Sequence, residues 1–188
     1  MEYKMGEDTC LNIIFDDRLY ERYNPLMKEL ESQNIDNYRI WTPVADKDSV
    51  VRSINLSHKQ IVSWAKKMGL KEVCIAEDDL QFTAPGAWEY FLSQKPDDYD
   101  IYLACTYIPP ISNNAICGFH LYMVNERFYD TYLSMAEDKH IDTEANSLEG
   151  KFVFCYPFPA LQRACWSANN RAVVNYNSVL KKEDIWQG

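Results

Sequence analysis

The stretch KEVCIAEDD, residues 71–79, decides the fold of this chain. Its apolar run, residues 73–76, ends abruptly at three adjacent carboxylates, Glu77, Asp78 and Asp79. A short apolar run between polar residues is typical of a strand that is buried on both faces of a parallel sheet. We therefore expect a buried strand here, with the acid cluster at its carboxyl end.

The residues before this strand predict a long amphipathic helix. One stripe of side chains recurs at intervals of four, three, four and three residues: Ile54, His58, Ile61, Ala65 and Met68. Lysines at positions 66 and 67, followed by a glycine at position 69, are typical of the end of a helix. A helix that leads into a buried strand is the repeating unit of a parallel sheet.

The rest of the chain repeats this alternation. A strand is predicted at residues 10–15, and a helix follows with Asn24 as its cap and Pro25 in its first turn. Further helices are predicted after Pro85 and Asn125, and further strands at 38–44, 101–108, 115–124 and 152–156. We expect an α/β fold in a single domain, residues 1–188, with a mostly parallel central sheet flanked by helices.

Two polar segments follow predicted strands of this sheet. They are Asp16-Asp17-Arg18 after the first strand and the acid cluster at residues 77–79. Ligands of parallel α/β sheets bind at the carboxyl ends of the strands. The two segments should therefore share one functional face.

Composition and charge exclude several classes of protein. Nineteen Lys and Arg stand against twenty-eight Asp and Glu, a net charge of −9, so the chain has no broad basic surface for nucleic acid. No apolar run approaches the ~20 residues of a transmembrane helix. Residues 1–10 lack the basic start and apolar stretch of a secretory signal. Six scattered cysteines without a CxxC pair are expected to be reduced core thiols of a cytoplasmic protein.

Three adjacent carboxylates at the end of a buried strand repel one another, and burial raises their pKa values unless a positive group compensates. A divalent cation is a common compensation. Because side chains alternate along a strand, Glu77 and Asp79 should point to one side and form the ligand pair for Mn²⁺ or Mg²⁺. Asp78 would then be held by backbone or basic groups. A solvated acidic turn is the simpler alternative.

The order of motifs resembles glycosyltransferase family 25, which includes lipooligosaccharide galactosyltransferases and their collagen-modifying relatives. In that family, as here at Ser57-His58 and residues 77–79, a Ser-His pair on a helix precedes a strand that ends in Glu-Asp-Asp. Weaker matches follow at residues 118–124, at Ile141-Asp142, and at residues 159–162 together with Ser167. The resemblance covers about residues 9–170.

The resemblance implies a GT-A-like nucleotide-diphospho-sugar transferase fold and a metal-dependent transfer of a hexose from a nucleotide-sugar donor. The acceptor would be a glycan or glycolipid in surface polysaccharide or lipooligosaccharide assembly. Glu77 and Asp79 would bind the metal, with Asp16 and Arg18 near the nucleoside of the donor. Asp142 is the candidate base if the enzyme inverts, and Glu144 is the second candidate. For Asp142, which lies in the acidic stretch of residues 136–149, a solvated loop carboxylate is the simpler alternative.

The remaining candidates have structural alternatives. His58 lies on the apolar stripe, where its ring would hydrogen-bond backbone near the acid cluster and hold that loop. Ser57 could do the same or contact the donor. Gln162 and Ser167 could reach the rim of the site or stabilise a loop. Trp64, Trp88 and Trp166 could stack on sugars or belong to the core.

Two other functions compete with an active transferase. One is a non-catalytic or inactive homologue that binds a sugar or nucleotide, since residues 15–18, Phe-Asp-Asp-Arg, differ from the Asn-Leu-Asp-Arg type usual in the family. The other is a metal-dependent phosphohydrolase that uses the same acid cluster. The second lacks the further acid cluster that a two-metal centre needs.

Overall fold

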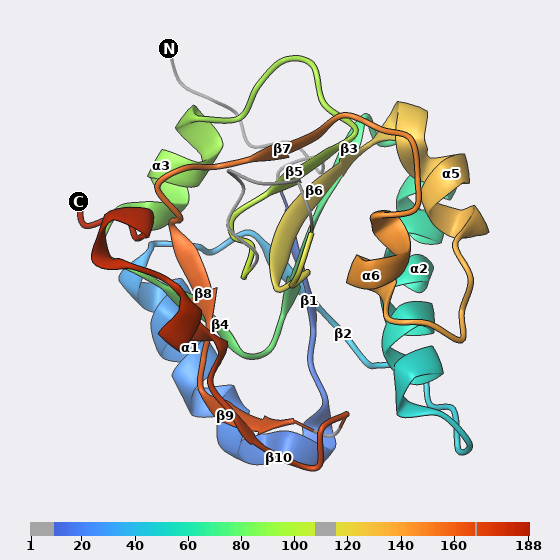
Figure 1. Ribbon diagram of the computed structural model, residues 1–188, viewed down its shortest axis with the longest axis horizontal. Helices are drawn as coiled ribbons and strands as arrows, with labels where there is room; N and C mark the ends of the chain where they lie inside the picture. The colour runs from blue at the N-terminus through green and yellow to red at the C-terminus, as the bar shows by residue number, and fades with distance from the viewer. Residues whose placement is uncertain (1–9, 108–115, 168) are drawn as a thin grey trace.

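The computed structural model describes residues 10–107, 116–167 and 169–188. At its centre is a six-stranded sheet of order β2-β1-β3-β6-β5-β7 (Figure 1). The strands are β1 (Leu11–Ile14), β2 (Tyr38–Trp41), β3 (Glu72–Glu77), β5 (Ile101–Leu103), β6 (Leu121–Asn125) and β7 (Phe152–Phe154). Only β6 runs against its neighbours within this sheet. The α/β class with a mostly parallel central sheet is therefore confirmed.

Helices cover both faces of the sheet (Figure 1). Alternation along β3 explains this, because Cys74 and Ala76 belong to one apolar cluster while Val73 and Ile75 belong to another. The first cluster packs against α1 (Tyr23–Ser32) and α3 (Ala87–Ser93). The second packs against α2 (Val50–Met68), α5 (Tyr129–Ser134) and α6 (Ile141–Ala145). A strand that is buried on both sides is what the continuous apolar run predicted.

Helix α2 has the ends and the buried face that its sequence predicts. Its N-cap is Ser49, whose hydroxyl accepts a hydrogen bond from the backbone of Arg52, and its C-cap is Gly69 in the left-handed conformation at φ +71°. Within the stripe, Ile54 is half-buried, His58, Ile61 and Ala65 are buried, and Met68 is 59% exposed. The expectation for Met68 is wrong because the chain turns at Gly69 and Leu70 packs against the core in its place.

Several predicted boundaries need correction. The 3-10 helix η2 (Asp17–Arg22) continues directly into α1, so Asn24 and Pro25 lie inside the first turn of α1 and the N-cap is Arg22. Helix α3 begins only after Gly86, in the left-handed conformation. Several strands are shorter than predicted: β5, for example, pairs with β6 and β7 over three residues only. Residues 108–115 lie outside the described residues.

Two small antiparallel sheets bring the C-terminal segment beside the end of β3. β4 (Leu80–Phe82) pairs with β8 (Ala160–Gln162), and β9 (Cys165–Ser167) pairs with β10 (Ala172–Val174). Three further 3-10 helices are η3 (Glu126–Phe128), η4 (Tyr176–Val179) and η5 (Lys182–Asp184). The β4–β8 pairing places Gln162 opposite Leu80, one residue beyond the acid cluster.

Two further expectations concern the cysteines and the membrane. All six cysteines lie within the described residues and none forms a disulfide, as the sequence predicted. Among the described residues, no helix combines the length and apolar composition needed to cross a bilayer.

Candidate functional site

The carboxyl ends of β1 and β3 meet at one edge of the sheet. The two strands are parallel and in register, with Ile14 opposite Glu77. The backbone N–H of Asp16 donates to Oδ2 of Asp78 across 2.9 Å. The expectation that residues 16–18 and the acid cluster share one face is therefore confirmed.

The acid cluster straddles the end of a strand. Strand β3 ends at Glu77, and Asp78 and Asp79 form the turn that leads into β4. Strand alternation therefore does not extend across the cluster, and each carboxylate has its own surroundings. Asp78 contacts a backbone N–H and a basic side chain, as expected: Oδ1 lies 2.5 Å from Nη1 of Arg22. Burial raises the pKa of Asp78, and the charge of Arg22 opposes that shift.

Asp79 is buried and incompletely hydrogen-bonded. Its Oδ2 accepts from Nε2 of Gln162 across 2.9 Å and from Sγ of Cys165 across 3.6 Å. Its Oδ1 is buried and has no hydrogen-bond partner among the described residues. Burial raises the pKa of Asp79 to about 7, and the nearby carboxylates of Glu77 and Asp78 add to the shift. A buried carboxylate oxygen without a partner is unusual and marks a place where a ligand could bind.

Glu77 is oriented by a buried chain of hydrogen bonds. Its Oε1 lies 3.1 Å from Nε2 of His58, and Nδ1 of His58 lies 2.7 Å from the hydroxyl of Tyr122. That hydroxyl lies 2.6 Å from the hydroxyl of Tyr132. Burial alone would raise the pKa of Glu77, but the hydrogen bond and charge of His58 lower it below its usual range. His58 thus holds the acid cluster as predicted, but it does so through side chains and not through backbone.

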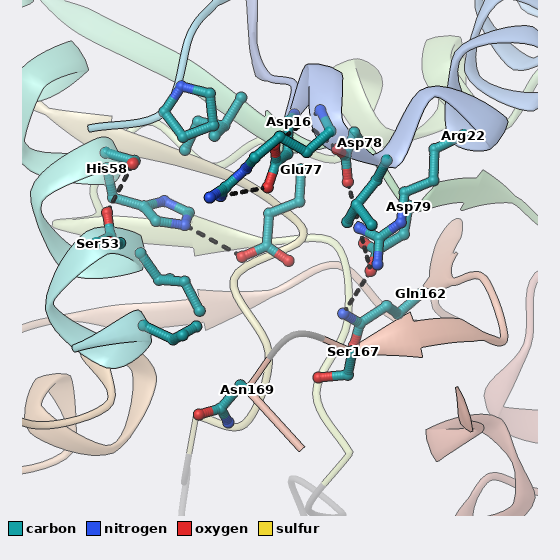
Figure 2. A pocket seen from close by; sticks show the side chains of 17 residues that line it. Asp16, Arg22, Ser53, His58, Glu77, Asp78, Asp79, Gln162, Ser167 and Asn169 are labelled. Atoms are coloured by element: carbon teal, nitrogen blue, oxygen red, sulfur yellow. Dashed lines mark hydrogen bonds and ion pairs between the residues drawn. The ribbon is translucent and has the colours of Figure 1, made fainter. Parts of the chain in front are cut away.

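Two cavities open beside the acid cluster. The first, of about 150 Å³, is lined by residues from β1, η2, α2, the acid cluster and the C-terminal segment (Figure 2). The second, of about 170 Å³, extends toward α6. Five lining residues belong to both: Ile54, Glu77, Gln162, Ser167 and Asn169. The carboxylate of Glu77 therefore lies where the two cavities meet.

The residues expected near the donor all line the first cavity: Asp16, Arg18, Ser57, His58, Asp78 and Gln162. Arg18 is mostly exposed and contacts both oxygens of Asp16, with Nη2 2.7 Å from Oδ2, and these hydrogen bonds lower the pKa of Asp16. The hydroxyl of Ser57 donates to the Ser53 carbonyl and accepts from the Val44 N–H. Ser57 therefore fixes the loop before α2. Ser167 belongs to both cavities and accepts hydrogen bonds from Asn170.

The two candidate bases lie in different surroundings, although both are on α6. Asp142 lines the second cavity, where its Oδ2 accepts from the Gly118 N–H and its Oδ1 accepts from the Thr143 N–H. Glu144 lines neither cavity and forms an ion pair with Lys139 at 3.2 Å. Of the two candidate bases, therefore, only Asp142 lines a cavity in which a substrate could contact it.

Some site residues carried no signal in the sequence. Arg22 lies on no motif, yet it contacts Asp78 and lines the first cavity. Tyr122 and Tyr176 were two among thirteen tyrosines. The tryptophans line neither cavity: Trp88 is buried in the core, Trp64 packs on Trp41, and Trp166 is 46% exposed.

The site supplies some of the ligands that a divalent cation needs. Among the described residues, no group of three or more Asp, Glu, His or Cys side chains gathers in a metal-binding arrangement. Glu77 and Asp79 are nevertheless among the four carboxylates that line the first cavity, and the unpartnered Oδ1 of Asp79 is an oxygen of the type that Mn²⁺ and Mg²⁺ prefer. The donor set therefore fits a cation that takes its remaining ligands from a substrate.

No family model matches the chain, and no curated protein matches its sequence. Among solved structures, the chain is similar to a glycosyltransferase involved in the glycosylation of the major capsid of PBCV-1, with 10% identity, 77% of this chain and 80% of that chain covered, and a TM-score of 0.48. It is also similar to A197 from STIV, with 13% identity, coverage of 77% and 80%, and a TM-score of 0.46.

A third similar structure is the catalytic domain of Drosophila beta1,4-galactosyltransferase 7 in complex with xylobiose. The two structures have 15% sequence identity and a TM-score of 0.44, and the similarity covers 78% of this chain and 63% of that chain. Identities this low leave the function to be argued from the site itself.

Proposed function

We propose that the protein is a metal-dependent glycosyltransferase with a GT-A-like fold. It would move a hexose from a nucleotide-sugar donor to a hydroxyl of a glycan or glycolipid acceptor. The observation that carries the proposal is the meeting of two cavities at Glu77. One cavity has arginines and a buried, unpartnered carboxylate oxygen, and the other has a carboxylate suited to act as a base.

The first cavity suits the anionic donor. Arg18 and Arg22 both line it and supply positive charge near the acid cluster. Glu77 and Asp79 would hold Mn²⁺ or Mg²⁺, which stabilises the negative charge of the departing diphosphate when bound. Asp78 is occupied by Arg22 and by the Asp16 N–H, so it positions the turn. The similarity to family 25 in the Ser-His and Glu-Asp-Asp motifs supports the same assignment.

The second cavity suits the acceptor. Asp142 would take the proton of the acceptor hydroxyl as that oxygen bonds to the anomeric carbon of the donor sugar. The bond from the anomeric carbon to the diphosphate oxygen breaks at the same time, and the nucleoside diphosphate leaves with its electron pair. This single displacement inverts the anomeric centre. The hydrogen bonds from Gly118 and Thr143 fix the orientation of the Asp142 carboxylate.

Titration calorimetry with Mn²⁺ and a panel of nucleoside diphosphates tests the proposal. We expect one nucleotide to bind more tightly with the metal than without it. Asp79→Ala should abolish that gain, whereas Asp130→Ala, at an exposed carboxylate on α5, should leave it unchanged. Absence of metal-enhanced binding for every nucleotide would refute the metal-dependent transferase.

A non-catalytic binding protein is the second candidate, because the arrangement of the first cavity would bind a nucleotide whether or not transfer follows. Release of free sugar from a nucleotide-sugar donor, measured with and without acceptors, separates the two. Donor binding without release or transfer would favour the binding protein. Transfer that Asp142→Asn removes would favour the enzyme.

A further inference from the structure

The two cavities differ in their basic groups, because only the first is lined by arginines. The first contains Arg18 and Arg22 together with carboxylates. Among the described residues that line the second, none is a lysine or arginine, while Glu77 and Asp142 are both carboxylates. Its remaining titratable groups are the exposed His140 at the mouth and the side chains of Cys117, Tyr107 and Tyr176. An anion in the second cavity would therefore meet the carboxylate of Asp142, with no lysine or arginine among the described lining residues to offset it.

Two of the three side-chain amides that line the second cavity donate to neighbouring side chains, and Asn169 is the third. Nε2 of Gln162 donates to Asp79. Nδ2 of Asn170 donates to the Ser167 hydroxyl at 3.1 Å and to the Tyr176 hydroxyl at 2.9 Å. Carboxylates accept hydrogen bonds only, and Oδ2 of Asp142 has a further lone pair beyond its single donor, the Gly118 N–H. Oδ1 accepts from both the N–H and the hydroxyl of Thr143. The carboxylate of Asp142 thus favours a ligand that brings O–H donors.

Two tyrosines give the second cavity an aromatic wall. Tyr107 is buried, and its hydroxyl accepts from the Gln162 N–H at 2.6 Å and donates to Oδ1 of Asn177 at 3.1 Å. Tyr176 lies next to it with a ring-centroid distance of 5.4 Å and is 37% exposed. The hydrogen bonds to both hydroxyls fix the rings, so the exposed ring of Tyr176 is a preformed apolar surface beside hydrogen-bond acceptors.

We propose that the second cavity selects an uncharged sugar residue as acceptor and excludes acidic sugars and phosphorylated residues. The C–H face of the sugar would pack on Tyr176, and its hydroxyls would donate to Asp142. The inference rests on the proposed transferase function. It adds the chemical class of the acceptor, argued from the sign of the charges and the direction of the hydrogen bonds in this cavity.

Saturation-transfer NMR tests the selection on protein loaded with Mn²⁺ and the nucleotide that binds best. The probes are pairs of methyl hexosides and the corresponding methyl hexuronides, in the galacto, gluco and manno series. Each pair differs only in a CH₂OH group against a carboxylate. We expect at least one neutral hexoside to bind and its hexuronide to bind at least about tenfold more weakly, since juxtaposed like charges oppose binding.

Variants connect this selectivity to the cavity. Tyr176→Ala should remove hexoside binding, and Tyr176→Phe, which keeps the ring, should retain it. Asn170→Lys adds a positive charge and should reduce the difference in affinity between the hexuronide and the hexoside. Tyr38→Ala, at an exposed tyrosine on the edge strand β2, is the control and should change neither.

The outcomes separate the two proposals. Equal binding of hexoside and hexuronide, or no hexoside binding while the nucleotide binds with metal, overturns the acceptor inference and leaves the donor site standing. Failure of every nucleotide to bind overturns the transferase proposal itself.

Discussion

The guanidinium of Arg22 lies against the carboxylate of Asp78, with Nη1 2.5 Å from Oδ1, and joins the end of η2 to the turn after β3. Both side chains are nearly buried, at 11% and 6% exposure. Arg22→Gln would leave a buried carboxylate without its counter-charge, which costs about 3–5 kcal/mol of the free energy of unfolding. Urea unfolding of the variant measures this cost.

Two further variants show whether Arg22→Gln lowers the free energy of unfolding because its ion pair is buried. Arg18→Gln breaks the ion pair with Asp16, where the arginine side chain is 73% exposed, and should cost about 1 kcal/mol or less. Asp78→Asn in the Arg22→Gln background should restore part of the stability, because one of the two buried carboxylates that lose Arg22, Asp78 and Asp79, is then neutral. Equal losses for Arg18→Gln and Arg22→Gln would contradict the account.

The chain of hydrogen bonds from Tyr132 to Glu77 predicts that one substitution lowers both the stability of the protein and its metal-dependent nucleotide binding. Tyr122→Phe leaves Nδ1 of His58 and the Tyr132 hydroxyl without their partner, at a cost of about 1–3 kcal/mol. It also frees the His58 ring that orients Glu77, so Mn²⁺-dependent nucleotide binding should weaken by about 10–100-fold. Calorimetry and thermal unfolding measure the two effects on one sample.

Tyr102→Phe is the matched control for this variant. Tyr102 is equally buried, but its hydroxyl donates to the Phe91 carbonyl, on the opposite face of the sheet. It should lower stability without changing metal-dependent binding. Similar binding losses in both variants would show that Glu77 needs no orientation by His58.

The fold was more predictable from sequence than the site. The run at residues 73–76 and the spacing along α2 specify buried faces directly, because burial requires apolar side chains at fixed periods. The end of β1 beside the end of β3 followed from the parallel sheet alone. Strand ends were less predictable, since β5 ends together with its edge partner β7 and not where its apolar residues stop.

The contacts within the site could not be read from periodicity. Arg22 reaches Asp78 from 56 residues away along the chain, and Gln162 reaches Asp79 from 83 residues away. Such contacts depend on how η2 and β8 pack on the sheet. Alternation also failed at the acid cluster, because the chain leaves the strand conformation after Glu77 and enters a turn.

In the loop that precedes α2, the carboxylate of Asp46 should stabilise the fold at neutral pH and lose this effect in acid. The carboxylate of Asp46 accepts hydrogen bonds from the Asp48 and Ser49 N–H groups and from Arg52. The Asp48 backbone bond is the largest of the causes that hold its pKa below 3.8, with smaller contributions from Ser49 and Arg52. Because the folded pKa is below the unfolded value, the stabilisation is complete well above pH 4 and is lost as pH falls through the folded pKa.

Asp46→Asn should therefore destabilise the protein at pH 6, and the difference from the wild type should shrink on acidification from pH 4 to pH 3. Urea unfolding at each pH gives the difference. Asp48→Asn is the control, because it makes the same change in net charge at a side chain that accepts none of these bonds. Its stability difference from the wild type should not show the same decrease between pH 4 and pH 3. A difference for Asp46→Asn that stays constant from pH 6 to pH 3 would contradict the prediction.

The two carboxylates of α6 give a test of the catalytic base. Asp142 lines the second cavity beside Glu77, whereas Glu144 lines neither cavity and pairs with Lys139. Asp142→Asn should lower the rate of transfer by about 10²–10⁴-fold, because a general base contributes that range. Nucleotide affinity should not change, since the first cavity does not include Asp142. Glu144→Gln should keep most of the transfer rate.

The measurement is sugar transfer at saturating donor and acceptor, with thermal unfolding as a check on folding. An amide at position 142 has one acceptor oxygen, so it cannot satisfy both the Gly118 and Thr143 N–H groups, and a loss of about 1 kcal/mol in stability is expected. That loss is too small to unfold the protein and too small to explain a rate change of 10²-fold or more. A large rate loss in Glu144→Gln with an active Asp142→Asn would transfer the role of base to Glu144. Equal, small losses in both would place the proton acceptor outside α6.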